Sequence, residues 1–188
     1  IAVKEFENAQ ARGVKAMSVR KGDVLIGVAE SRGGTGEIVL ATAAGKAIRF
    51  AEKTVREMGR AAGGVRGINL GKGDHVVGMT LADGKGDVLT VTEHGYGKRT
   101  PFAEYRVTGR GGKGIVNLKV TDRTGPVVAV LKALETDEVM LTTAKGIFLR
   151  AKVKDVREIG RNAQGVHLIR LDAGDKLVAA ARLVPEDA

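Results

Sequence analysis

The sequence predicts an all-β fold, a propeller-like array of small sheets, and three observations lead to this prediction. The chain of 188 residues repeats itself at spacings of 50 and 51 residues. Each repeat contains apolar and β-branched runs of strand length. A glycine separates the first two runs, where a tight hairpin needs a positive φ angle. One small sheet cannot bury both faces alone, so units of this length become stable when neighbours stack on them.

The repeat is clearest in three nine-residue segments. They read EIVLATAAG at 37–45, DVLTVTEHG at 87–95 and EVMLTTAKG at 138–146. A Gly-Arg pair follows each segment in register, with a second glycine five residues after the first. The N-terminal segment 13–28 matches 64–79 at a spacing of 51. The chain therefore divides into a partial blade, 1–36, and three blades, 37–86, 87–137 and 138–188.

Each complete unit is expected to form about four short strands. In the first unit they cover 37–43, 46–51, 65–70 and 75–81. The run Ile-Val-Leu-Ala in the first strand is apolar throughout, as in sheets covered on both faces. The segment 52–58 and its counterparts predict either a loop or a short helical turn.

The charge predicts a polyanionic partner. Lys and Arg total 31 against 22 Asp and Glu, a net charge of +9, which suits nucleic acid or an acidic membrane surface. The absence of cysteine excludes disulfides and thiolate metal sites. No run of 18 apolar residues and no signal peptide is present, so we expect a soluble, cytoplasmic chain without a membrane partner. The start at Ile1 suggests a piece of a longer protein.

The stretch GRGGKG at 109–114 fits the spacing G-x-G-x-x-G of dinucleotide sites. That spacing binds a pyrophosphate only where a helix leaves the turn. The run Ile-Val-Asn-Leu-Lys-Val at 115–120 predicts a strand instead, and the counterparts at 59–64 and 160–165 lack the middle glycine. A dinucleotide site is therefore not indicated, and both glycines shared by the three copies are predicted turn positions that a Cβ would strain.

Three arginine positions recur in every complete unit, once per blade. The first column is Arg49, Arg99 and Arg150, the second Arg56, Arg106 and Arg157, and the third Arg60, Arg110 and Arg161. The first column could simply pair with the recurring acids Glu37, Asp87 and Glu138. Charges at the same place on each blade rim would also form a curved stripe that follows a phosphate backbone.

Further cations lie near these columns in the sequence and would extend the stripe. The predicted DNA-binding set is Arg49, Arg56, Arg60, Arg66, Lys98, Arg99, Arg106, Arg110, Lys113, Arg150, Arg157 and Arg161. Lys15 and Lys46 lie beside it. Aromatic residues are only 3% of the chain, so stacking platforms for single strands are scarce, and duplex DNA held without marked sequence preference is the expected ligand.

No catalytic or metal site is predicted. The histidines His75, His94 and His167 occupy non-equivalent positions, and each is expected to be a surface or strand residue. No phosphate loop of the G-x-x-x-x-G-K-[ST] type occurs. A kelch or WD40 interaction scaffold remains a rival interpretation, although those repeats depend on aromatic residues and this chain has no Trp.

Four runs resemble the C-terminal domain of the DNA gyrase A protein. They are MGRAAGGVRGINLGKGDHVVGM (58–79), TEHGYGKRTPFAEY (92–105), GRGGKGIVNLKVTDR (109–123) and IGRNAQGVHLIR (159–170). The resemblance covers essentially the whole chain. The related topoisomerase IV protein has similar but more divergent repeats and is the second choice. The leading Gln and basic residue of the family's Q-[RK]-R-G-G-K-G box are missing before GRGGKG, so we interpret that stretch as a degenerate copy.

The resemblance implies a β-pinwheel, a disc of four-stranded blades that exchange a strand with their neighbours. It implies that duplex DNA wraps around the basic rim and that the full gyrase uses this wrap for ATP-dependent negative supercoiling. The implied partners are DNA, the catalytic domain of the same polypeptide and the ATPase subunit of gyrase. The cleavage tyrosine, ATP and Mg²⁺ belong outside this chain, so no cofactor is expected within it.

Overall fold

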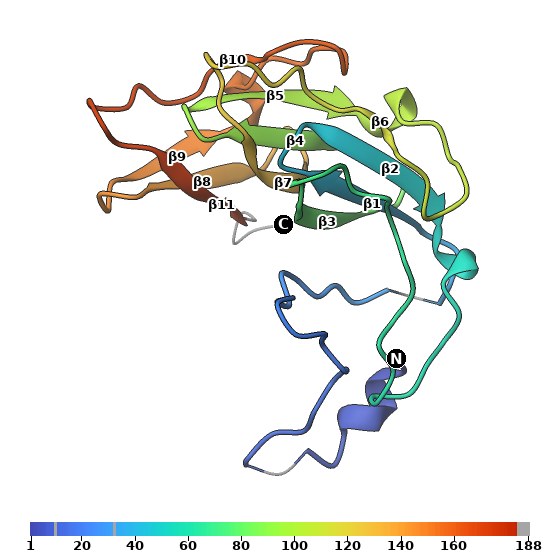
Figure 1. Cartoon of the computed structure of the whole chain (residues 1–188). Coiled ribbons are helices and arrows are strands. Elements are labelled where there is room, and N and C mark those ends of the chain that lie inside the picture. The colour runs from blue at the N-terminus through green and yellow to red at the C-terminus, as the bar shows by residue number, and fades with distance from the viewer. Residues whose placement is uncertain (10, 32, 184–188) are drawn as a thin grey trace.

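A computed structural model describes residues 1–9, 11–31 and 33–183, which fold into small antiparallel sheets (Figure 1). The strands are β1 (Glu37–Thr42), β2 (Lys46–Ala51), β3 (Val76–Ala82), β4 (Asp87–Thr92), β5 (Tyr96–Pro101), β6 (Ile115–Val116), β7 (Val127–Ala133), β8 (Glu138–Thr143), β9 (Phe148–Lys152), β10 (Val166–His167) and β11 (Leu177–Leu183). Short 3-10 helices are η1 (Val3–Phe6), η2 (Glu52–Thr54), η3 (Phe102–Glu104) and η4 (Val153–Asp155). The all-β prediction is confirmed, and the segment after each hairpin begins with a short helical turn. None of the helices among the described residues has the length and hydrophobicity needed to cross a bilayer.

The strands form three sheets, which we call blades 1, 2 and 3. Their strand orders are β3-β1-β2-β6, β10-β5-β4-β7 and β11-β8-β9. The outer strand of blade 1, β6, comes from the next sequence unit and pairs with β2 through Lys46–Val116 and Ala47–Ile115. Blade 2 likewise receives β10, which pairs with β5. The strand exchange expected from the resemblance is therefore present at both junctions between complete units.

The hairpin glycines show how closely the exchanged segment approaches. Gly45, Gly95 and Gly146 have φ angles of +76°, +80° and +86°, so the predicted tight turns are confirmed. A Cβ on Gly45 would lie 2.3 Å from the Leu118 carbonyl oxygen, and one on Gly95 would lie 2.5 Å from that of Ile169. A Cβ on Gly146 would meet nothing within 4 Å, because blade 3 receives no exchanged strand from the described residues.

Apolar side chains fill the spaces between neighbouring blades. On β4, Val88 joins a cluster with Val39 of blade 1, whereas Leu89 joins a cluster with Val139 of blade 3. Successive residues of a strand point to opposite faces, so both faces of this central sheet are covered. This arrangement explains why the first strand of each unit is apolar almost throughout.

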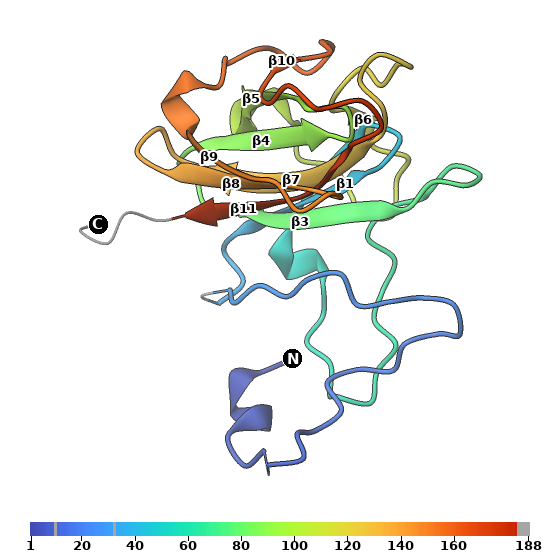
Figure 2. The same cartoon turned by 90° about the vertical axis from the view of Figure 1, so that its left-hand side faces the viewer.

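Two predicted segments form no strand. Residues 65–70 lie beside the stretch 111–112 instead, with Asn69 N–H donating to the Gly112 carbonyl at 2.9 Å. No hairpin precedes them among the described residues to accept them as an outer strand, which is the role that β6 and β10 fill downstream. The described residues of the partial unit, 1–9, 11–31 and 33–36, also form no strand, and they extend away from the sheets (Figure 2). Their apolar side chains stay in contact with solvent, with Val28 91% exposed.

Gly95→Ala and Gly146→Ala test the exchange contact. Both substitutions place a side chain at a positive φ, which costs on the order of 1–3 kcal/mol. Gly95→Ala also drives a Cβ into the Ile169 carbonyl, so we expect it to lower the free energy of unfolding by at least about 1 kcal/mol more than Gly146→Ala. Urea denaturation measures both. Equal losses would show that the exchanged segment does not press on the turn.

Candidate nucleic-acid interface

The first arginine column pairs with the recurring acids. Arg49 Nε lies 2.6 Å from a Glu37 carboxylate oxygen, and Arg99 Nη1 lies 2.8 Å from Asp87. Arg150 makes the same pair with Glu138. In each hairpin the acid and the arginine lie on adjacent strands and twelve residues apart. The alternative that the sequence left open, local ion pairing, is therefore the arrangement present.

Two of these arginines also hold the next sequence unit. We call residues 52–64, 102–114 and 153–165 the crossing segments, because the last two lead from a hairpin to the outer edge of the preceding blade. Arg49 donates to the Tyr105 carbonyl at 3.1 Å, and Arg99 donates to the equivalent Val156 carbonyl at 2.8 Å.

The exposure of the first column follows from this contact. The side chains of Arg49 and Arg99 are only 14% and 6% exposed, whereas that of Arg150, which no crossing segment covers, is 65% exposed. The charges of Arg49 and Arg99 are thus engaged inside the protein, and neither side chain is presented as a free rim cation.

Lys98 is also an internal residue, with no exposed surface. Its ammonium donates to the carbonyls of Gly160 and Arg161 at 2.7 and 3.0 Å, so it fastens the third crossing segment to blade 2. Burial, with a smaller contribution from the Arg161 charge, lowers the pKa of Lys98 to about 8. The equivalent residues Ile48 and Leu149 are apolar, which is the sequence signal that marks this position as buried.

The third column is partly structural. Arg110 donates to the carbonyls of Thr54 and Arg66 at 3.0 and 3.1 Å. Arg161 donates to the Val116 carbonyl at 2.9 Å, and Val116 is the counterpart of Arg66. The buried Nε atoms of Arg60 and Arg161 have no hydrogen-bond partner within the described residues. These guanidinium groups position the crossing segments and use only part of their donor capacity.

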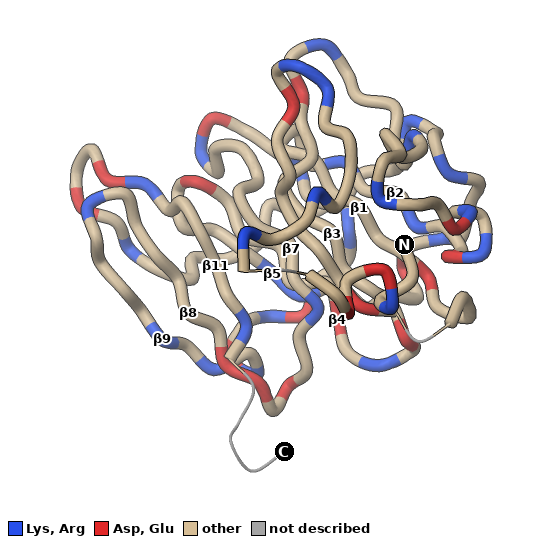
Figure 3. The backbone as a smooth tube through the Cα atoms, turned by 90° about the horizontal axis from the view of Figure 1, so that it is seen from below, with Lys and Arg blue, Asp and Glu red and all other residues tan. Residues whose placement is uncertain are grey.

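The second column is the one directed to solvent. Arg56, Arg106 and Arg157 are exposed, and no ion pair or side-chain hydrogen bond engages them in the described part of the chain. Each follows shortly after a 3-10 helix at the start of its crossing segment. Arg66 and Lys113 are exposed as well. Figure 3 shows Lys and Arg along the outer loops beside β2 and β9, with Asp and Glu between them.

Arg106 and Lys113 line a shallow hollow of about 290 Å³ at the outer edge of blade 1, where the stretch GRGGKG passes over β2. The closing glycine is tightly constrained, because Gly114 has φ +71° and a Cβ on it would lie 2.6 Å from the Ala47 carbonyl oxygen. The turn prediction is correct for this glycine and its counterparts Gly64 and Gly165. The first shared glycines, Gly59, Gly109 and Gly160, also stand at turns, each directly before two turn residues. The predicted strain is wrong for them, because they have no positive φ and open space at the Cβ position.

The structure also groups cations that the repeat columns did not identify. Arg123 and Arg170 lie near Tyr96 and His167 at one end of blade 2. None of these four residue types recurs at equivalent positions of the other units, so the repeat pattern does not reveal them.

The family described as DNA gyrase C-terminal domain, beta-propeller, matches residues 1–30, 36–83, 86–133 and 137–183. The chain is 42% identical over 182 residues to the DNA gyrase A protein of Salmonella typhimurium, covering 97% of this chain and 21% of that protein. It is 43% identical over 179 residues to the Klebsiella oxytoca protein, covering 95% and 20%. The chain thus spans about a fifth of the length of these relatives.

Solved structures agree with the fold. A DNA gyrase A C-terminal domain superposes with a TM-score of 0.82 at 27% identity, covering 92% of this chain and 59% of that one. A DNA topoisomerase IV C-terminal domain superposes with a TM-score of 0.88 at 23% identity, covering 96% and 56%.

Arg99→Gln and Arg150→Gln compare the buried and exposed members of the first column. Arg99→Gln leaves the Asp87 carboxylate buried without its cation, so we expect a loss of about 3–5 kcal/mol in the free energy of unfolding. Arg150→Gln removes an exposed pair and is expected to cost less than about 1 kcal/mol. Chemical denaturation distinguishes the two, and a similar small loss in both variants would contradict a structural role for Arg99.

Lys98 predicts a rise of stability at alkaline pH. Its pKa in the folded state, about 8, lies below the ordinary 10.5, so the unfolded chain binds the proton more tightly between these values. The cost of burying the charged ammonium is fully present below pH 8. Deprotonation relieves this cost as the pH rises, so the free energy of unfolding increases by about 2 kcal/mol between pH 7 and 9.5. Burial raises the pKa of Tyr105, which weakens stability only at higher pH.

Lys98→Met provides the control for this pH dependence. Urea titrations at pH 7, 8, 9 and 9.5 are expected to show the gain in the natural chain and its absence in the variant. The same pH profile in both proteins would refute the assignment to Lys98.

Proposed function

The chain belongs to the DNA gyrase C-terminal domain family, and on that premise we propose that it binds and bends duplex DNA along its outer edge. Contacts go to backbone phosphates and carry little sequence preference. The net charge of +9 supports this proposal, because a positively charged protein attracts a polyanion electrostatically. The small aromatic content favours a duplex over a single strand.

The observation that carries the proposal is the second arginine column. Arg56, Arg106 and Arg157 occupy the same place in three successive units and are exposed in each. A fold that needed these cations internally would bury them, as it buries Arg99. Their guanidinium groups are therefore available to phosphate oxygens, with which arginine forms forked, charge-assisted hydrogen bonds.

The hollow at the outer edge of blade 1 supports the same interface. Arg106 and Lys113 line it, together with backbone from Gly109, Gly112 and Gly114. Two exposed cations beside a glycine backbone without side chains are suited to one phosphate group. Arg66 and Arg110, both exposed, lie on the neighbouring stretches of chain.

The number of exposed cations bounds the salt dependence. About five to seven phosphate contacts would give a slope of log affinity against log salt of about −4.5 to −6.3. Bending 20 to 30 base pairs costs on the order of 1–6 kcal/mol, so several contacts from successive blades are needed to hold the DNA curved. Arg99 and Lys98 do not enter this interface, because their charges are engaged inside the protein. Arg49 also lines the hollow, but its guanidinium is already bound to Glu37 and to the Tyr105 carbonyl, so we assign it no phosphate contact.

In the full enzyme we assign the chain an accessory role within the DNA gyrase A protein. Wrapped DNA would supply the segment for ATP-dependent strand passage, and this passage would introduce negative supercoils. The partners in this role are the catalytic domain of the same polypeptide and the ATPase subunit of gyrase, where ATP and Mg²⁺ act. The chain itself holds no catalytic group or cofactor in this scheme, and its place is on the bacterial nucleoid. The corresponding topoisomerase IV domain is the second candidate, favoured by its similar fold.

Arg106→Gln combined with Arg157→Gln tests the interface. We expect weaker binding of a duplex of ~40 base pairs, and a salt slope reduced by about two, because each lost phosphate contact removes ~0.9 from the slope. Fluorescence anisotropy at several salt concentrations measures both quantities. The melting temperature should change by less than about 3 °C, since exposed residues without partners are replaced.

Lys4→Gln combined with Lys21→Gln is the charge-matched control, because both lysines are exposed in the N-terminal partial unit. An equal loss of affinity in the control pair would mean that net charge alone binds DNA. Unchanged affinity in the arginine pair would remove the second column from the interface.

A further inference from the structure

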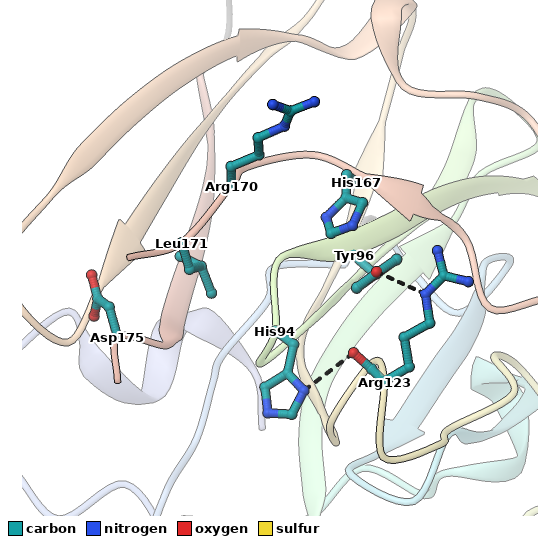
Figure 4. Close-up of a pocket in the computed structure, with 7 residues that line it drawn as sticks. All are labelled: His94, Tyr96, Arg123, His167, Arg170, Leu171 and Asp175. Atoms are coloured by element: carbon teal, nitrogen blue, oxygen red, sulfur yellow. Dashed lines mark hydrogen bonds between the residues drawn. The ribbon is translucent and has the colours of Figure 1, made fainter. Parts of the chain in front are cut away.

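A second hollow lies at one end of blade 2, away from the one lined by Arg106 and Lys113. Its volume is about 620 Å³, and its lining comes from the β4–β5 turn, the turn before β7, β10 and the loop after β10. Figure 4 shows the residues that line it, which are His94, Tyr96, Arg123, His167, Arg170, Leu171 and Asp175. Two sequence units meet here, because His167 and Arg170 belong to the segment exchanged onto blade 2.

Three planar groups are stacked on one side of this hollow. The rings of Tyr96 and His167 have centroids 4.0 Å apart and are inclined by 37°. The Arg123 guanidinium lies 5.0 Å from the Tyr96 ring centroid, and its Nε donates to the Tyr96 hydroxyl at 2.8 Å. The Arg123 carbonyl oxygen lies 3.2 Å from His94 Nδ1. These contacts set the position of Arg123 and leave its two terminal nitrogens without a protein partner in the described part of the chain (Figure 4).

The charge in the hollow is positive. The lining contains two arginines, Arg123 and Arg170, and one carboxylate, Asp175, which lies apart from both guanidinium groups (Figure 4). One oxygen of Asp175 already accepts the backbone N–H groups of Lys145 and Lys176, at 3.1 and 2.8 Å, so this acid stabilises the adjacent turns. Glu93 lies beside the hollow, with one carboxylate oxygen 3.3 Å from the Lys176 ammonium and the other 3.8 Å from Nε2 of His94. The donors of both arginines thus remain available to an anion.

The fold of a blade does not require this group. The positions equivalent to Tyr96 hold Lys46 and Ile147, and both of those blades form the same hairpin. The stack therefore reflects a property of blade 2 alone, in contrast to the repeated arginine columns.

We propose that this hollow is a second phosphate-binding site, which accepts one phosphate group between Arg123 and Arg170. A guanidinium oriented by a hydroxyl offers a forked pair of donors that matches two phosphate oxygens. The exposed imidazoles of His94 and His167 lie at the margin of the hollow, where a bound anion would change their surroundings. The phosphate is either one of a DNA backbone that continues past the outer edge or one of a free phosphate compound, and the first source rests on the proposed function.

Histidine NMR reports on the site directly. The imidazole rings of His94 and His167 line the hollow, so their C2–H signals report on binding there. His75, in the loop before β3, lies outside the hollow and serves as an internal control. The signals are assigned by single His→Gln variants. The folded chain is titrated with inorganic phosphate, with a ~40-base-pair duplex, and with chloride at matched ionic strength.

We expect the His94 and His167 signals to shift saturably while the His75 signal stays unchanged. Arg123→Gln combined with Arg170→Gln should abolish this shift, whereas Lys4→Gln combined with Lys21→Gln should preserve it. For the duplex, the arginine pair should also reduce the salt slope by about two. Arg123→Lys keeps the charge but loses the forked geometry and should give an intermediate shift.

The outcomes separate the two sources and the two proposals. A shift with inorganic phosphate supports a site for free phosphate compounds, even in a chain that failed to bind DNA. A shift with the duplex alone supports a backbone phosphate as the occupant. If neither titration moves the two signals beyond the chloride control, the site is refuted, and duplex binding through the second column would stand unaffected.

Discussion

The fold depends on one constraint, which is that the outer strand of a blade comes from the following sequence unit. The exchanged segment reaches its position only because a glycine without Cβ stands at the hairpin turn, where the Ile169 carbonyl would lie 2.5 Å from a Cβ on Gly95. Two charged side chains of the receiving hairpin then bind the segment that leads to it, Arg99 through the Val156 carbonyl and Lys98 through those of Gly160 and Arg161. Successive blades are thus linked by covalent continuity, main-chain pairing and buried cations together.

This constraint also determines which basic residues are buried and which stay exposed. A cation on the receiving strand is covered when the next unit docks, as Arg49 and Arg99 are, and the uncovered Arg150 remains 65% exposed in the same column. A cation early in the crossing segment, such as Arg106, lies outside the junction and stays in solvent. The repetition that builds the array of blades therefore exposes one guanidinium group per unit, and the interface that we propose for a repetitive polyanion rests on this arrangement.

The sequence predicted those features that local chemistry determines in every copy. The strands β1, β2 and β3, the turn at Gly45 and the closing turn at Gly114 all follow from patterns that recur in register. It could not separate Arg99 from Arg106, because burial depends on which blade receives the exchanged segment, and that is a long-range property. Proximity in the sequence groups Lys98 with the rim cations, although its apolar counterparts Ile48 and Leu149 indicate a buried position. Arg123 and Tyr96 meet only in space, so no spacing in the sequence points to their stack.

The central claim is that exposed cations on successive units hold duplex DNA along a curve, and the end-to-end distance of bound DNA tests it most directly. A duplex of ~40 base pairs with a donor and an acceptor dye at its ends is nearly straight when free, because the persistence length of DNA is about 150 base pairs. The account predicts that saturating protein raises the energy transfer between the dyes and that added salt reverses the rise as binding is lost. Binding at full saturation with unchanged energy transfer would contradict it.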